Sequence, residues 1–559
     1  MKERAALAAA LAAAALLAFG GALGAPPAYD DQVYLQANPF HRQSAGAVLK
    51  ALVSRDYFAR TDERSWQPLV TALESAARGR PGPVRAAALA AWAGCGVLVA
   101  SLAAALGATP AGAAAGALAF TLFPAAAEAL AVASFSGHVF ALFFVLAAAR
   151  LFLAGSAFGA AVALALGLTA KESAVTALPV LALLAWAQGL SWRKAVPALA
   201  VFAVYAVWRW GFLEPAPPIG ALAYPFDGTL PWQSFGFQVR HLVLPWPLCL
   251  ERTFDSAWDI ERFARFLAPL AWAGAAWVCR RERPRLAALL WVGAAAAPVL
   301  HLIPFANLSP AADRYLLASA APAAVFAALW AGTQRRAGVL AALGLVFGAL
   351  AVPRALLFRE PSALAGQTEA CAPAHPRALA LRGADLYGRG RFSEAALRFE
   401  KAFALQPALR APFRDPGLFH VQGRDYVMGL MRLREGKGAE AEGYLREAVS
   451  QAEPGPARAA ALDRLGDALF LTPAKVLEAR EAYRLASVEV PSWAMAYAKQ
   501  AGTMRQPEAA QALPLLRKAL ELSADATDEE RYFREEVTAA IARAEGKRVS
   551  VSVFRNFRK

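Results

Sequence analysis

Two adjacent carboxylates near the start of the chain are the residues best placed to do chemistry. Asp30 and Asp31 follow an apolar run, residues 5–25, that is long enough to cross a membrane. Lys2 and Arg4 precede this run, and because basic residues stay on the cytoplasmic side, the acidic pair is expected on the outer face. There it could serve as a general base or hold a cation. A solvated acidic loop is the simpler alternative.

The composition indicates a membrane protein with many helices rather than an ordinary soluble domain. Of the 559 residues, 58% are hydrophobic and 18% are charged, and the mean hydropathy is +0.36. Much of the net charge of +15 lies in short clusters between apolar runs, which is typical of topology signals and of contacts with anionic lipids. We therefore expect membrane lipids, and no nucleic acid, as partners.

Ten further apolar runs follow the first, so the sequence predicts about eleven transmembrane helices in an all-α polytopic bundle. The later runs cover residues 86–106, 109–124, 134–153, 156–170, 173–188, 195–213, 263–279, 286–304, 315–333 and 337–353. If odd-numbered helices run outward, the inner loops contain basic residues, as the positive-inside rule requires. These residues are Arg150, Arg193, Lys194, Arg280, Arg281, Arg283, Arg285, Arg335 and Arg336. A retained first helix is preferred over a cleaved signal peptide because its apolar run is longer than a signal peptide requires.

An odd number of helices places the chain after residue 353 on the same side as Asp30. This part becomes rich in charge, and small residues recur in it at matched offsets, which is the pattern of tetratricopeptide repeats. We expect a helical solenoid with a concave face that binds protein segments. The three clearest copies contain Gly383, Ala395, Phe399 and Ala402; Gly429, Ala441, Leu445 and Ala448; and Gly466, Ala479, Tyr483 and Ala486.

The domain boundaries follow from these changes in composition. We expect a transmembrane domain at 1–353 with outer loops 26–85 and 214–262, a linker at 354–375, repeats at 376–540 and a basic tail at 541–559. Cys249 and Cys371 are both expected outside, where they could form a disulfide, although the sequence leaves their pairing open.

Several charged or polar side chains interrupt or end the apolar runs, and the topology places all of them on the outer face. Burying a charge without a partner costs several kcal/mol, so each such residue needs a reason to be there. Helix caps and interfacial anchors would explain any one of them. Their convergence on one leaflet favours a site where a carboxylate acts on a substrate while Lys and Arg hold a phosphate. The residues are Glu128, His138, Lys171, Glu172, Arg240, His241, Asp313, Arg314 and Tyr315.

These features in this order resemble the GT-C glycosyltransferases, and within them the O-mannosyltransferase-like group that carries transmembrane helices and tetratricopeptide repeats. The matching stretches are Asp30-Asp31, Trp66-Gln67-Pro68-Leu69, Phe123-Pro124 with Glu128, Lys171-Glu172 and Asp313-Arg314-Tyr315. Gln67 stands where the family has Arg, Phe123 where it has His, and Ser136-Gly137-His138 where Gly-Arg is common. The identity of the sugar is therefore left open, as is a diverged or inactive member.

The resemblance implies an inverting transfer of a sugar, mannose or another hexose, from a polyprenyl-phosphate carrier to a hydroxyl acceptor such as protein Ser or Thr. Asp30 or Asp31 would be the catalytic base, and Lys171 and Arg314 would stabilise the leaving phosphate. Glu128, His138, Glu172, Arg240, His241 and Tyr315 would complete the substrate and lipid-phosphate site. No cofactor is expected; a divalent metal, if used, would be held by Asp30, Asp31 and Glu128.

Two other functions remain open. An O-oligosaccharyltransferase or polysaccharide ligase would use a lipid-linked glycan and would place its catalytic residues in a late outer loop. A membrane-anchored scaffold would use only the repeats, leaving the outer-face charges without a role. A transporter is less favoured because ionisable residues near helix midpoints are scarce. We expect the protein in a bacterial inner membrane, with the repeats on the extracytoplasmic side.

Overall fold

The structure is a computed structural model, and the residues it describes form an all-helical protein. They are 2–31, 35, 38–61, 65–214, 228–254, 260–302, 309–407, 423–504, 508–523 and 528–546. Helix accounts for 80% of the structure, and no strand occurs within these ranges. The predicted all-α class is confirmed. Residues 547–559 of the expected basic tail lie outside the described part of the chain.

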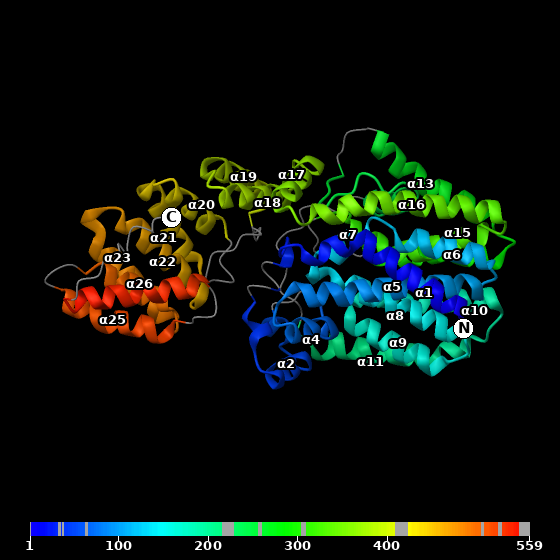
Figure 1. The fold of residues 1–559 in the computed structure, drawn as a ribbon, viewed down its shortest axis with the longest axis horizontal. Helices are drawn as coiled ribbons and strands as arrows, with labels where there is room; N and C mark the ends of the chain where they lie inside the picture. Colours follow the sequence, from blue (N-terminus) through cyan, green and yellow to red (C-terminus); the bar gives the residue numbers. More distant parts are fainter. Residues whose placement is uncertain are drawn as a thin grey trace. The chain divides into compact units, whose positions relative to one another are not determined.

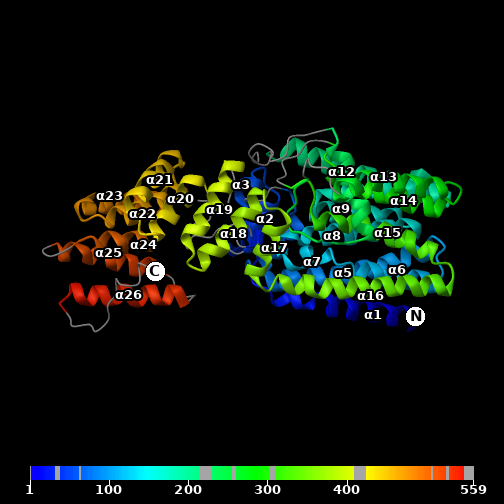
Figure 2. The same ribbon diagram turned by 90° about the horizontal axis from the view of Figure 1, so that it is seen from above.

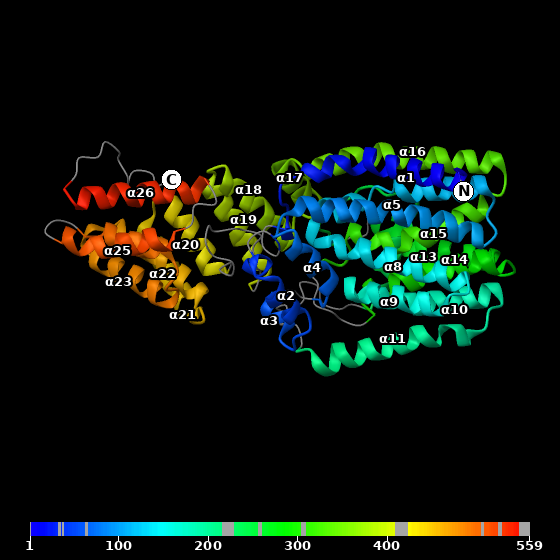
Figure 3. The same ribbon diagram turned by 60° about the horizontal axis from the view of Figure 1, so that its bottom comes forward.

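The chain forms two compact units, residues 1–378 and 379–559. In the first unit, long helices lie side by side along a common direction (Figures 1 and 3). They are α1 (Lys2–Phe19), α5 (Pro81–Ala105), α6 (Pro110–Thr121), α8 (Ser136–Leu153), α9 (Ala157–Ala170), α10 (Ala177–Gln188), α11 (Val196–Ala206), α12 (Leu230–Val243), α13 (Ile260–Val278), α14 (Arg283–Ala296), α15 (Leu316–Trp330) and α16 (Gln334–Leu357). Each apolar run expected from the sequence falls on one or more of these helices.

Five helical stretches in the described residues are long and apolar enough to cross a membrane. The other helices of the bundle fall short of this criterion. α9 and the stretch Glu172–Gln188, for example, are apolar but shorter. The five stretches are Lys2–Gly24, Pro81–Ala105, Ala133–Leu153, Trp192–Phe212 and Gln334–Leu357.

Small residues let the helices of the bundle approach closely. α6 packs against both α15 and α16. A Cβ atom added to Gly116 of α6 would lie 2.8 Å from the Cβ of Ala328 in α15, which is closer than side chains pack. Apolar helices without large side chains at the contact gain van der Waals packing along their backbones. The Ala-rich and Gly-rich composition of this region is thus a requirement of the packing.

Short helices connect the long ones at the end of the bundle opposite the N-terminus, as Figures 2 and 3 show for α2, α3 and α17. These helices are α2 (Ala45–Leu52), α3 (Tyr57–Thr61), α4 (Pro68–Ala76), α7 (Ala126–Ala131) and α17 (Pro361–Cys371). The acidic pair follows α1, and the stretch before α15 carries Asp313 and Arg314, so the polar residues singled out above belong to this end.

The segment 354–375, expected as a linker, is largely helical. It contains the end of α16 and all of α17, and Cys371 at the end of α17 is disulfide-bonded to Cys249. The first compact unit accordingly extends to residue 378. The sequence suggested a linker because charge rises here and the apolar runs end, but the covalent bond and α17 attach this segment to the bundle.

The second unit consists of successive antiparallel helices, each packed against the next along the chain (Figure 2). They follow α18 (Pro376–Gly388) and are α19 (Phe392–Leu405), α20 (Arg424–Arg434), α21 (Gly438–Gln451), α22 (Pro456–Phe470), α23 (Val476–Glu489), α24 (Ala494–Gly502), α25 (Ala509–Leu522) and α26 (Asp528–Ala544). A Cβ on Gly466 would lie 2.5 Å from the Tyr483 ring. Gly383 faces Phe399 and Gly429 faces Leu445 in the same way.

Candidate functional site

Asp31 is fully buried, and partners engage both of its oxygens. Arg85, at the start of α5, donates to one oxygen at 2.9 Å, and the backbone N–H of Ala133 donates to the same oxygen at 3.1 Å. The backbone N–H of Ser134 donates to the other at 2.8 Å. Burial raises the pKa of the Asp31 carboxyl, and the charge of Arg85 opposes this rise. Asp31 therefore ties the segment after α1 to α5 and to the start of α8.

Asp30 differs from its neighbour because its side chain is 18% exposed. It pairs with Arg377, whose guanidinium also lies over the ring of Tyr29 at 4.2 Å. Tyr29 has a left-handed backbone with φ of 55°, a conformation that an aromatic residue adopts only under constraint. This turn sends the two carboxylates to different partners, so one is locked inside and the other reaches the surface.

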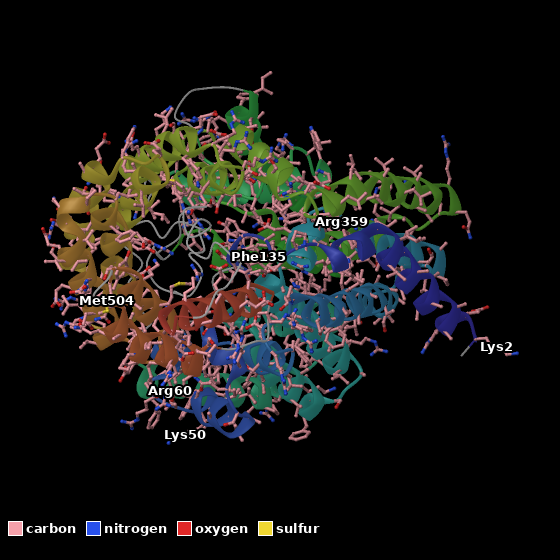
Figure 4. The ribbon with its side chains drawn as sticks, turned by 60° about the vertical axis from the view of Figure 1, so that its left-hand side comes forward. Lys2, Lys50, Arg60, Phe135, Arg359 and Met504 are labelled. Atoms are coloured by element: carbon pink, nitrogen blue, oxygen red, sulfur yellow. A yellow bond between two sulfur atoms is a disulfide. The ribbon has the colours of Figure 1, made fainter. Side chains whose placement is uncertain are left out.

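Glu128 and Arg314 form a second buried ion pair. Arg314 donates from its side chain to one oxygen of Glu128 and from its backbone N–H to the other at 3.2 Å. Its guanidinium lies 4.1 Å above the ring of Phe135. Phe135 is buried within the first unit, unlike the exposed Lys50, and both residues are labelled in Figure 4. Burial raises the pKa of the Glu128 carboxyl, and the charge of Arg314 opposes this rise. The ion pair satisfies both oxygens of Glu128.

Three more of the predicted site residues gather around Arg314. The rings of His138 and Tyr315 are 5.8 Å apart, and Arg314 lies over the ring of Tyr315 at 4.9 Å. Lys171 and Arg314 are both close enough for their charges to act on the imidazole of His138. The structure therefore brings together Glu128, His138, Lys171, Arg314 and Tyr315 from four different helix junctions.

Glu172 belongs to a separate contact, although it is next to Lys171 in sequence. Arg209, in the π-helical turn Val207–Phe212, donates to its carboxylate at 2.6 Å, and the backbone N–H of Trp66 donates at 3.3 Å. Arg209 also lies 4.8 Å above the ring of Phe58. Glu172 thus holds the predicted outer loop against the end of the helix that contains Arg209.

Asp313 is fully buried between two arginines. Arg252 donates to one of its oxygens at 2.7 Å, and Arg354, near the end of α16, donates to the other at 3.2 Å. The charge of Asp313 raises the pKa of the Glu128 carboxyl, and the charge of Arg354 lowers it. Asp313 therefore links the chain before α13 to α16 and borders the Glu128–Arg314 pair.

Arg240 and His241 are adjacent in α12 and contact each other. Arg240 donates to Nε2 of His241 at 2.9 Å, and Nδ1 of His241 donates to the carbonyl of Phe237 at 3.0 Å. The imidazole is fully buried. Burial lowers the pKa of His241 well below its ordinary value, and the charges of Arg252 and Arg240 lower it further. His241 is therefore neutral.

A polar chain leads from the disulfide to Asp30. Glu251, two residues after Cys249, accepts from Ser309 and lies 3.6 Å from His375 and 3.5 Å from Arg377. Arg377 in turn pairs with Asp30. The charge of Glu251 also reaches Arg314. The partner of the partly exposed Asp30 thus comes from Arg377, at the start of the segment that was expected to form repeats.

The three carboxylates proposed as metal ligands do not form a metal site. Asp30, Asp31 and Glu128 each pair with a different arginine, and none contacts another. Within the described ranges, no group of three or more His, Cys, Asp or Glu side chains is arranged to hold a metal ion. Of these three carboxylates, Asp30 is the partly exposed one, and it pairs with Arg377.

Six arginine and glutamate residues of this network were not predicted from the sequence, although for some of them a signal was present. Arg209 lies inside an apolar run, and Arg354 directly follows the last apolar run. Arg314 was identified because it is a charge that interrupts or borders such a run, and the same criterion applies to both. Arg85 and Arg377 lie in charged stretches that resemble ordinary loops, and no local signal separates them from their neighbours. Glu251 and Arg252 lie in an outer loop where charges are unremarkable.

No protein-family model matches this sequence, and no curated protein matches it either.

Proposed function

We propose that this chain is a membrane glycosyltransferase of the GT-C type that moves a sugar from a polyprenyl-phosphate carrier to a hydroxyl acceptor, such as protein Ser or Thr. The observation that carries the proposal is the divided acidic pair. Asp31 is locked by Arg85 and two backbone N–H groups, while Asp30, from the same turn, is partly exposed and pairs with Arg377. The ring of Tyr29, which precedes Asp30, lies 5.9 Å from the ring of Phe135, on which Arg314 packs.

The proposed topology has about eleven spans, with Asp30 on the extracytoplasmic side of a bacterial inner membrane. Two observations support this orientation. Lys2 and Arg4 lie at the start of the first helix, and the Cys249–Cys371 disulfide belongs to the parts of the chain assigned to the outside. Disulfides persist in oxidising compartments such as the periplasm and are rare in the cytosol.

Asp30 is the proposed catalytic base, and Asp31 is a positioning residue. A base must reach the proton that it removes, and Asp31 is fully buried. The strained turn at Tyr29 and the anchor at Asp31 hold Asp30 in place before substrate arrives. Arg377 must leave Asp30, or share it, when the acceptor hydroxyl binds.

The proposed step is a single displacement. Asp30 takes the proton of the acceptor hydroxyl, whose oxygen forms a bond to the anomeric carbon of the sugar. The bond from that carbon to the phosphate oxygen breaks, and the lipid phosphate leaves with the electron pair, so the configuration inverts. A cation near the phosphate stabilises the charge that develops in the transition state.

The second unit is proposed as a tetratricopeptide solenoid that presents the acceptor. The contacts of Gly383, Gly429 and Gly466 with Phe399, Leu445 and Tyr483 support this, because an offset of 16 residues, or 17 in the third copy, pairs a small residue with a large one in three successive hairpins. A solenoid of such hairpins has a concave surface suited to an extended protein segment.

The test is sugar transfer in membranes from cells that express the full chain. A panel of radiolabelled polyprenyl-phosphate sugars is supplied with and without EDTA, and membranes without the protein give the background. Transfer above background that EDTA does not reduce is expected. Transfer only from a lipid pyrophosphate-linked glycan would favour the ligase alternative. No transfer from any donor by folded protein would contradict the proposal and favour the scaffold.

A further inference from the structure

Arg240 has a different kind of partner from six other arginines at this end of the first unit. Six others each lie within 4 Å of a carboxylate, whereas in the described part of the chain no such ion pair includes Arg240. The charge of Glu261 acts on Arg240 at a distance. The Glu261 carboxylate itself contacts Arg265, at 3.3 Å. The six paired arginines are Arg85, Arg209, Arg252, Arg314, Arg354 and Arg377.

A neutral imidazole holds Arg240 in place of an acid. His241 gives its Nδ1 proton to the Phe237 carbonyl, which leaves the Nε2 lone pair to accept from Arg240 at 2.9 Å. The His241 ring also packs on the Phe237 ring, with centroids 4.0 Å apart. The carbonyls of Phe237 and Pro247 favour a second proton on the imidazole, but burial and the nearby cations outweigh them.

Because their partners differ, Arg240 and Arg314 differ in whether their charge is available to attract an anion. Glu128 cancels the charge of Arg314, and a buried pair of this kind is costly to separate. His241 orients the guanidinium of Arg240 without cancelling its charge. The charge of Arg252 also acts on Arg240 and His241, and because Arg252 and Arg354 share the single carboxylate of Asp313, these two arginines are only partly neutralised. A planar guanidinium that keeps its charge is suited to a phosphate.

The surroundings of Arg240 indicate a phosphate carried on a lipid. Arg240 is itself partly exposed, and three apolar residues that follow it are largely exposed: Val243 at 74%, Leu244 at 57% and Trp246 at 60%. α12 is not among the stretches that could span a membrane. A cation beside exposed aliphatic and indole groups is typical of a membrane interface, where a lipid phosphate lies.

We infer that Arg240, oriented by its hydrogen bond to His241, binds the phosphate of the lipid donor, and that Arg314 does not. This rests on the proposed function and changes one of its assignments. Arg314 becomes a positioning residue that fixes Glu128 and Phe135. The phosphate then lies beside α12, close to the junction of Arg252 with Asp313.

The test measures binding rather than transfer. The full chain is purified in detergent, and geranylgeranyl phosphate is titrated calorimetrically against the wild type, Arg240→Gln, Arg240→Lys and Arg314→Gln. Arg193→Gln, which removes an exposed arginine in a predicted inner loop, is the matched control. Inorganic phosphate and phosphatidylglycerol are titrated in parallel as the two other sources of a phosphate. Circular dichroism and size-exclusion chromatography verify that each variant is folded.

Loss of a charged hydrogen bond predicts binding roughly 10- to 100-fold weaker in Arg240→Gln, a smaller loss in Arg240→Lys, and no change in Arg193→Gln. Any folded Arg314→Gln protein should bind as the wild type does. Wild-type affinity in Arg240→Gln would overturn the inference and leave the proposed function intact. Equal affinity for inorganic phosphate or phosphatidylglycerol would overturn the assignment to the lipid donor. No binding by the wild type would contradict the proposed function itself.

Discussion

Charged residues have different surroundings in the two units. In the first unit, Asp31, Glu128 and Asp313 are fully buried, and each is held by arginines from distant parts of the chain. In the second unit the ion pairs are generally less buried. Some join neighbouring turns of one helix, as in Arg391 with Glu394, and others join adjacent helices, as in Arg446 with Glu478. Asp463, buried beside Lys499, is an exception.

The buried ion pairs of the first unit fix side-chain geometry at a cost in stability. Taking an ion pair out of water costs several kcal/mol for each ion, and its attraction only repays that cost when the geometry is good. Exposed ion pairs contribute about 0–1 kcal/mol to stability and constrain the positions of their side chains only weakly. The end of the bundle is therefore organised by polar contacts, whereas the second unit is organised by the fit of small and large side chains.

The largest effect is expected at Asp31. Replacing it by Asn leaves Arg85 buried with a neutral partner, so the free energy of unfolding should fall by about 3–5 kcal/mol, the usual result of breaking a buried pair. Thermal unfolding of the full chain in detergent measures the change. A stability equal to that of the wild type would remove Asp31 from its anchoring role and weaken the contrast between the units.

A smaller effect is expected where the second unit depends on fit. Gly466→Ala places a methyl group against Tyr483, and this ring cannot easily move because its hydroxyl donates to Asp467 at 2.8 Å. Overpacking should cost about 1–3 kcal/mol. Hydrogen exchange of α22 and α23 in the full chain should rise, with Gly443→Ala as a control because nothing lies within 4 Å of a Cβ there. Equal protection in both variants would contradict close packing at this contact.

The smallest effect is expected at an exposed ion pair. Glu394→Gln removes the partner of Arg391, and both side chains are about half exposed. The loss should be about 0.2–0.5 kcal/mol, as for pairs on a helix surface. Proteolysis of residues 379–559 in the intact chain should hardly change. A loss comparable to that of Asp31→Asn would mean that surface charge, and not fit, organises this unit.

The helices could be predicted from the sequence because apolar runs and small residues act locally. The residues of the candidate site were found in part for the same reason: Asp30, Glu128 and Arg314 stand out beside apolar runs. Their partners were not found, since Arg85 and Arg377 are 54 and 347 residues away from the carboxylates they hold. Burial decided the roles within the acidic pair, because Asp30 and Asp31 are chemically identical in the sequence.

The central claim is that one aspartate does chemistry and its neighbour holds the structure. We would measure sugar transfer and thermal stability together in the wild type, Asp30→Asn, Asp31→Asn and Asp56→Asn. Asp56 is the control, because it is an exposed outer-loop aspartate that pairs with Arg60. Asp30→Asn should lose roughly 10²–10⁴-fold in rate with little loss of stability. Asp31→Asn should lose stability first, and Asp56→Asn neither. Undiminished transfer by folded Asp30→Asn would contradict the account.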